Sequence, residues 1–349
     1  MVLYIVLFIV GLVLIIKGGD WFVDSASWIA EVLGVPKFVI GATIVSIATT
    51  LPEMFVSIQA TIKGNVDMAA GNAIGSVTAN TAMILGIFIM CSPFVIERKS
   101  FSPKALMMFA ASATLVLGCI FTTKQTLTFE GETGEYYSLS TIGTVVLIVI
   151  FIIFFIENFI SMKNSPTQIE PAPDSIAIQE EDDIVPTKKT ATGKDWAKNV
   201  ILFLVGAVAV VVGSDLLVDN GTEIALGFNV PQRVISVVAI AIGTSLPELV
   251  TTITALKKKE DAISIGNILG ANIIDLTLIL PICSFISLGS GNGALAVSVD
   301  SVTIDMVICL AAIVVAIAPT IITKKFHKWQ GAVTLLGYAA YIVTVFIGS

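Results

Sequence analysis

Two glutamates stand deep inside apolar segments of the chain. Glu53 ends the segment SIATTLPE and Glu248 ends the segment AIGTSLPE, each directly after a proline. Glu53 is the only charged residue between positions 38 and 62. A carboxylate removed from water is stable only when it is paired or coordinates a cation. Because neither segment contains a basic residue, the pattern favours a bound cation.

Hydroxyl side chains and a helix break accompany each glutamate. A proline within a helix lacks a backbone donor and clashes with the preceding turn, so it kinks the helix and frees carbonyl oxygens. Small hydroxyl residues closely precede each proline and offer further oxygen atoms. They are Thr49 and Thr50 in the first segment, and Thr244 and Ser245 in the second.

A second pair of motifs lies about one helix further along the chain. GNAIGSVTAN ends at Asn80 and contains Ser76, while GNILGANIID ends at Asp275. Together with the glutamates and hydroxyl residues, these side chains offer only oxygen ligands. Oxygen ligands without His or Cys suit hard cations such as Ca2+ or Na+ and argue against Zn2+ or Cu+. A purely structural proline kink is the alternative, and the presence of two symmetric copies disfavours it.

The composition is that of an integral membrane protein. Of the 349 residues, 56% are hydrophobic and 13% are charged, whereas soluble domains are about half apolar or less. About ten stretches approach the length that crosses a bilayer as a helix, so we expect an all-α protein with ten transmembrane helices. Their long unbroken runs exclude a β-barrel. We expect them near residues 3–23, 38–62, 69–93, 103–122, 139–161, 197–218, 233–256, 264–288, 302–323 and 331–348.

The two halves of the chain repeat each other. GGDWFVDS begins at residue 18 and GSDLLVDN at residue 213, and the glutamate motifs recur at the same offset of 195 residues. That offset contains an odd number of expected helices, so the second copy enters the membrane in the opposite direction. Inverted-topology five-helix repeats of this kind are typical of secondary transporters. We expect the repeats at residues 1–162 and 200–349, joined by a polar linker at 163–199.

Lys and Arg set the expected orientation. Threading the ten segments alternately puts most basic residues on one side and leaves only Lys63, Lys124 and Arg233 opposite. The basic side faces the cytoplasm. We therefore expect a multi-pass protein of the cell membrane with both termini outside and the linker inside. The first apolar run lacks the flanks of a signal peptide, so we expect it to be retained.

The paired motifs TTLPE with GNAIGSVTAN, and GTSLPE with GNILGANIID, resemble the two alpha repeats of the cation/calcium antiporter superfamily, especially its microbial Na+/Ca2+ exchangers. The resemblance covers nearly the whole chain. It implies ten helices in two inverted halves, with the second, third, seventh and eighth around the ions and the first and sixth as the moving part. It also adds backbone carbonyls at two positions to the ligand set. The implied metal ligands are Glu53, Glu248, Asp275, Asn80, Thr49, Thr50, Ser76, Thr244, Ser245, Ser46 and Ala241.

Both motifs depart from the superfamily pattern. Ala271 stands where a small hydroxyl residue often occurs, so one side-chain ligand is missing from the second motif. In the first motif, Val77 and Thr78 replace the usual Asn-Ile pair. Both departures bear on how Na+ would be coordinated.

The resemblance implies a Na+/Ca2+ antiporter that works by alternating access at an acidic site near the membrane midplane. Ca2+ and Na+ would bind as transported substrates, without a cofactor. H+/Ca2+ exchange and K+-dependent exchange are the alternatives within the superfamily, and a cation channel is the alternative from another class. The sequence carries no motif of a hydrolase or a phosphate loop, so we expect no enzyme. Beyond the ions and the lipid bilayer, we expect no nucleic acid and no obligate protein partner.

The linker should be dispensable for transport. Its acidic stretch QEEDD lacks the spaced ligands and the glycine of a calcium-binding EF-hand loop. Deleting residues 168–190 should therefore leave ion exchange in reconstituted vesicles intact. Loss of calcium activation in a folded deletion variant would instead identify the stretch as a regulatory site.

Overall fold

The protein is mostly helical and crosses the membrane several times. The computed structural model describes residues 2–64, 66–92, 95–129, 132–164, 191–227, 245–291 and 293–348. Within them, 8 helical segments are long and apolar enough to span a membrane. These are Val2–Leu33, Lys37–Ile62, Met68–Cys91, Arg98–Ile120, Thr141–Lys163, Gly193–Ile224, Asp261–Gly289 and Ser301–Thr323.

Two further helices lie where the remaining spans are expected. Helix α10 (Leu246–Lys257) covers the second part of the expected span 233–256, whose first part falls outside the described residues. Helix α14 (Lys328–Gly348) covers the last one. The count of ten transmembrane helices therefore stays a prediction.

Short π-helical turns interrupt several of the long helices. The first half comprises α1 (Val2–Leu33), α2 (Lys37–Ile40), the π-turn η1 (Gly41–Val45), α3 (Ser46–Ile62), α4 (Val66–Thr78), the π-turn η2 (Ala79–Ile84), α5 (Leu85–Cys91), α6 (Arg98–Ile120) and α7 (Thr141–Asn164). The second half comprises α8 (Gly193–Gly227), α10, α11 (Asp261–Ile274), the π-turn η3 (Asp275–Ile279), α12 (Leu280–Gly289), the π-turn η4 (Ser301–Asp305), α13 (Met306–Thr323) and α14. Helix α8 thus begins within the expected linker 163–199.

The sequence repeat reappears in the order of the elements. Helices α4 and α5 begin at residues 66 and 85, and α11 and α12 begin at residues 261 and 280, each 195 residues later. The π-turns η2 and η3 follow α4 and α11 at matching places. Helices α1 and α8 are counterparts in this register. The inverted relation of the complete halves remains a prediction.

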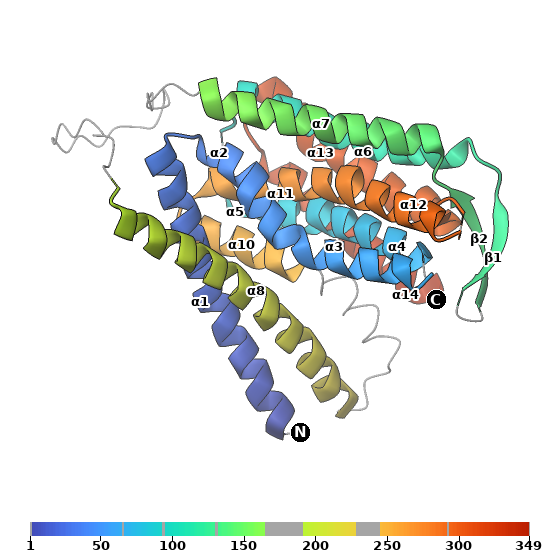
Figure 1. Ribbon diagram of the computed structural model, residues 1–349, viewed down its shortest axis with the longest axis horizontal. Coiled ribbons are helices and arrows are strands. Elements are labelled where there is room, and N and C mark those ends of the chain that lie inside the picture. Colours follow the sequence, from blue (N-terminus) through green and yellow to red (C-terminus); the bar gives the residue numbers. More distant parts are fainter. Residues whose placement is uncertain are drawn as a thin grey trace.

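Helices α1 and α8 lie against each other and run in opposite directions. Gly11 of α1 faces Gly213 of α8, whereas Gly18, further along α1, faces Gly206, which comes earlier in α8. This antiparallel pair crosses the rest of the bundle at a slant (Figure 1). Antiparallel packing of counterpart helices is the arrangement that inverted repeats require.

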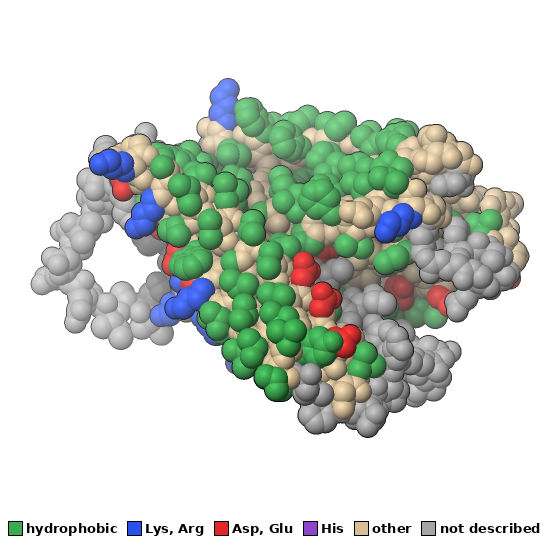
Figure 2. Space-filling view, turned by 60° about the horizontal axis from the view of Figure 1, so that its bottom comes forward, with side chains coloured by type: hydrophobic (Ala, Val, Ile, Leu, Met, Phe, Trp, Pro, Cys, Tyr) green, Lys and Arg blue, Asp and Glu red, His purple; other side chains and the backbone are tan. Residues whose placement is uncertain are grey.

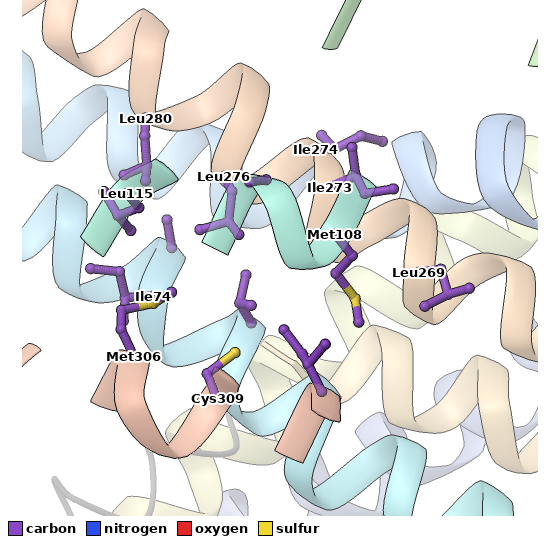
Figure 3. Close-up of a cluster of buried hydrophobic side chains, with 14 of the residues drawn as sticks. Ile74, Met108, Leu115, Leu269, Ile273, Ile274, Leu276, Leu280, Met306 and Cys309 are labelled. Carbon is purple, nitrogen blue, oxygen red and sulfur yellow. The ribbon is translucent and has the colours of Figure 1, made fainter. Parts of the chain in front are cut away.

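The main core joins both halves of the chain. Side chains of α4, α6, α11, η3, α12 and α13 point toward one another in it (Figure 3). Ile74, Met108, Leu115, Leu269 and Met306 are all buried there. By contrast, hydrophobic side chains cover most of the visible outer face and charged ones are few (Figure 2). An apolar exterior around a packed interior is what a bilayer requires of a helical bundle.

A small β-sheet corrects the purely α-helical prediction. Strands β1 (Gln125–Phe129) and β2 (Glu132–Ser138) form a hairpin between α6 and α7, and β3 (Ala296–Ser298) pairs antiparallel with β2. Tyr136 lies opposite Ser298 in this register. The segment between α6 and α7 is rich in threonine and aromatic residues, which favour strands. It is too short and polar to span a bilayer, so the pattern of long apolar runs does not reveal it.

Close glycine contacts between α1 and α8 generate a stability prediction. A Cβ atom at Gly206 would lie 2.7 Å from the Phe22 backbone nitrogen and 2.8 Å from the Gly18 carbonyl oxygen. Gly206→Ala should therefore separate the two helices and lower the free energy of unfolding by about 1–3 kcal/mol. Gly221→Ala, in the same helix, meets only the Phe8 ring at 3.4 Å and should be tolerated. Equal thermal stability of the two variants in detergent would contradict this packing.

Candidate cation-binding site

The three acidic residues predicted from the sequence are buried in different helical elements. Glu53 lies on α3, Glu248 on α10, and Asp275 is the first residue of η3, each with 1% exposure. The other predicted residues within the described ranges are also buried. They are Ser46, Thr49, Thr50, Ser76, Asn80 and Ser245. Ala241 and Thr244 lie outside the described residues.

The two prolines occupy different helical positions. Pro52 lies inside α3, where its missing N–H leaves the carbonyl four residues earlier without its usual donor. Pro247 lies in the first turn of α10, directly before Glu248. A helix N-terminus carries partial positive charge and favours a carboxylate. The sequence predicts a proline kink within both helices; of these two prolines, Pro52 is interior to its helix and Pro247 is not.

The flanking polar residues lie on the two π-turns. Asn80 belongs to η2 and Asp275 begins η3. A π-turn inserts one extra residue into a helical turn and often marks a functional site. The two turns thus carry a buried amide and a buried carboxylate at equivalent positions of the repeats.

The three carboxyl groups act on one another electrostatically. Glu53 feels the charges of both Glu248 and Asp275, and Asp275 feels that of Glu248. Three acidic groups within electrostatic reach in a buried region repel one another when ionised. A cation among them would offset that repulsion.

Buried oxygen atoms without hydrogen-bond partners gather on these residues. Both carboxylate oxygens of Glu53 lack a partner among the described residues, as do Glu248 Oε2 and Asp275 Oδ1. The same is true of Thr50 Oγ1, Asn80 Oδ1 and Ser245 Oγ. Native structures rarely leave buried polar atoms unpaired, so each calls for an explanation. Oxygen atoms of this kind are the ligands that Ca2+ and Na+ accept.

The carboxylates do not form a compact acidic cage. Among the described residues, no group of three or more His, Cys, Asp or Glu side chains is arranged to hold a metal ion. A cation between the two glutamates would therefore depend on hydroxyl, amide and carbonyl oxygens for its remaining ligands. Such mixed oxygen coordination is typical of Ca2+.

Glycines bring the two halves into contact beside the site. A Cβ atom at Gly270 of α11 would lie 2.6 Å from both the Ala42 carbonyl oxygen and Ser46 Oγ. Thr49 Oγ1 donates a hydrogen bond of 3.1 Å to Asn267 Oδ1 of α11. The hydroxyl residues of the first half thus touch the second motif of the other half directly.

Three asparagines near the site, of which Asn267 and Asn272 are fully buried, were not predicted as functional. Asn72 Nδ2 donates to the Glu53 carbonyl oxygen at 3.2 Å, and Asn267 accepts from Thr49. Asn272 Nδ2 donates to Thr81 Oγ1 at 2.9 Å. The signal for the first two was present, because each follows the glycine that opens its motif.

Three other acidic residues near helix ends, Asp20, Asp24 and Glu157, are ion-paired. Lys258 Nζ lies 2.9 Å from Asp24 Oδ1 and 3.4 Å from Asp20 Oδ1. Glu157 Oε2 lies 2.5 Å from Nζ of the buried Lys104. These groups have their own partners and stand apart from the set around Glu53.

Comparison with known proteins agrees with this architecture. The sodium/calcium exchanger protein family matches residues 3–159 and 198–347. The sodium/calcium exchanger MaX1 of Methanosarcina acetivorans is 28% identical over 356 residues and covers 97% of both chains. An uncharacterized membrane protein of Methanocaldococcus jannaschii is 28% identical over 338 residues, covering 97% of this chain and 95% of its own. A solved structure of the sodium-calcium exchanger NCX_Mj, soaked with Na+ and Sr2+, superimposes with a TM-score of 0.75 at 27% identity and covers 98% of both chains.

The fold and the buried oxygen set define a membrane transporter of the cation/calcium exchanger superfamily. The chain belongs to the sodium/calcium exchanger protein family. The resemblance noted from the paired motifs is thereby confirmed.

Proposed function

We propose that the protein is a Na+/Ca2+ antiporter that moves Ca2+ across the cell membrane against a Na+ gradient. Na+ and Ca2+ would compete for one acidic site near the membrane midplane, and the site would open to each side in turn. Membership of the sodium/calcium exchanger family supports the pair of ions. The orientation that follows from the basic residues puts both termini outside and the linker in the cytoplasm.

One observation carries the proposal. Glu53 and Glu248 come from equivalent positions of the two repeats and are both buried, and neither oxygen of Glu53 nor Oε2 of Glu248 has a hydrogen-bond partner among the described residues. Buried carboxylates with oxygens left unsatisfied are unfavourable without a cation. A divalent ion between them would neutralise both charges at once.

The remaining predicted ligands would complete the shell. Asp275 and Asn80 would contribute from the two π-turns, and Thr50 and Ser245 would contribute hydroxyl oxygens. Ca2+ takes about six to eight oxygens in flexible geometry. Na+ would use part of the same set, so the two ions could not be bound in full at the same time.

The choice of coupling ion is tested by imposed gradients. In proteoliposomes, a Na+ gradient should drive Ca2+ uptake, and a pH or K+ gradient imposed alone should not. Uptake driven by a pH gradient alone would instead identify an H+/Ca2+ exchanger. Ca2+ conductance that persists without any opposing ion would identify a channel.

Removing either glutamate charge should nearly abolish exchange. Glu53→Gln keeps the size of the side chain and one oxygen but removes the charge that offsets ion dehydration, and Glu248→Gln does the same in the other half. Each variant should lower Na+-dependent Ca2+ uptake by at least about thirtyfold, because the buried cation loses its interaction with one carboxylate charge. Folding should survive, since a neutral amide is easier to bury than a carboxylate.

A matched control separates charge at the site from charge in general. Glu223 lies on α8 but its side chain is exposed. Glu223→Gln should leave uptake close to normal. Near-normal uptake by a folded, monodisperse Glu53→Gln or Glu248→Gln variant would refute the shared site.

A hydroxyl at position 271 should change the Na+ dependence of transport. Ala271 is fully buried on α11, four residues before Asp275. Ala271→Ser would supply the side-chain oxygen that the superfamily pattern often has there. The variant should alter the apparent Na+ affinity more than the Ca2+ affinity, as measured by exchange over a range of each ion. Equal change in both affinities, or none, would show that position 271 does not face the ions.

A further inference from the structure

Equivalent asparagines of the two repeats are bonded differently. Asn72 of α4 and Asn267 of α11 occupy the same place in their motifs, 195 residues apart. Asn72 Nδ2 donates to the Glu53 carbonyl oxygen at 3.2 Å and to Ser57 Oγ at 3.0 Å. Asn267 Nδ2 has no partner among the described residues, although Asn267 is fully buried.

The counterpart residues on the adjoining helices, α3 and α10, also differ in their hydrogen bonds. Ser57 of α3 accepts from Asn72 and also donates to the Ala69 carbonyl oxygen at 3.2 Å. Its counterpart in α10 is Thr252, which is fully buried and whose hydroxyl has no hydrogen-bond partner within the described part of the chain. The polar contact that joins α3 to α4 is therefore not formed between α10 and α11.

Both groups needed for the missing contact between α10 and α11 are present. Asn267 supplies an unpaired donor, and Thr252 on the adjoining helix supplies an unpaired hydroxyl. Leaving buried polar groups unpaired is unfavourable, and a change of packing that pairs them recovers the loss. The geometry for that pairing is already present in the chain, because Asn72 and Ser57 adopt it in the other repeat.

Asn267 also touches the proposed ion ligands of the first half. Its Oδ1 accepts the hydrogen bond from Thr49, which lies one turn before Glu53 on α3. Asn72 holds the backbone of Glu53 itself. Through these hydrogen bonds, a movement of α4 or α11 would displace residues of α3 that lie around the ions.

We propose that Asn72 and Asn267 are positioning residues that exchange roles during transport. In the structure described, Asn72 fixes the glutamate-bearing helix α3, and Asn267 is released from α10. When the site opens to the other side, Asn267 bonds to the Glu248 backbone and Thr252, and Asn72 releases Glu53 and Ser57. In a transporter of inverted halves, such an exchange of conformations between the repeats switches the accessible side. This inference rests on the proposed antiport.

According to this proposal, turnover requires the hydroxyl of Thr252, although that hydroxyl forms no hydrogen bond in the structure described. A static view of the structure predicts that Thr252→Val is harmless, because Thr252 Oγ1 has no partner to lose. The exchange of roles predicts that the variant cannot form the opposite state properly. Losing one hydrogen bond in that state should slow Na+-driven Ca2+ uptake about five- to tenfold. Equilibrium binding of radioactive Ca2+ to the purified protein should stay within about twofold, since the described state loses nothing.

Two further variants keep the test decisive. Thr251 is also buried on α10 with an unpaired hydroxyl, but its counterpart in the first repeat is the apolar Val56. Thr251→Val should therefore exchange normally, and so should Thr252→Ser, which restores the hydroxyl. Normal uptake by Thr252→Val, or equally slow uptake by Thr251→Val or Thr252→Ser, would overturn the exchange of roles. Absence of Na+-driven Ca2+ uptake in the unmodified protein would instead overturn the proposed function.

Discussion

The arrangement of this protein depends on the cost of keeping carboxylates in an apolar interior. Glu53, Glu248 and Asp275 are each almost fully buried, and each has at least one oxygen without a hydrogen-bond partner among the described residues. Their mutual repulsion opposes close packing of the helices that carry them. A cation bound among these carboxylates would offset the cost of burying them. The free energy that it costs to bury these carboxylates without an ion would be recovered when a dehydrated cation binds among them.

Backbone irregularity is what brings these groups together. In hydrocarbon, freed backbone groups need partners, so irregular backbone is confined to places buried within the protein. The irregular places at the proposed ligands are an interior proline in α3, a proline in the first turn of α10, and π-turns at Asn80 and Asp275. Glycines on α11 allow the two halves to approach closely beside them. Other irregular places, such as the π-turn η4, carry no proposed ligand.

The membrane class and the buried acidic residues could be predicted from the sequence, because a charge within an apolar run and a repeated motif are both visible in the order of residues alone. The apolar run around Glu53 and its copy around Glu248 predicted both the membrane class and the buried acidic residues. The sheet of β1, β2 and β3 was not predicted, since pairing between β2 and β3 joins segments far apart in the chain. The π-turns were missed because one inserted residue leaves the hydrophobic pattern almost unchanged. The different bonding of Asn72 and Asn267 could not be read from the sequence at all, since their motifs are alike and only helix placement distinguishes them.

The glycine contacts between α1 and α8 have a mechanical consequence for coupling. Backbone lies directly against backbone at Gly18 and Gly206, and again at Gly11 and Gly213. This close packing at two levels joins the two helices into one unit. Elsewhere, β3 fastens the α6–α7 hairpin to the segment before η4, and Arg98 of α6 binds the carbonyl oxygens of Ile321 and Ile322 near the end of α13. The described chain thus divides into a tightly packed helix pair and a bundle whose outer helices are cross-linked to one another, so a force applied to one helix of the pair would be carried by both.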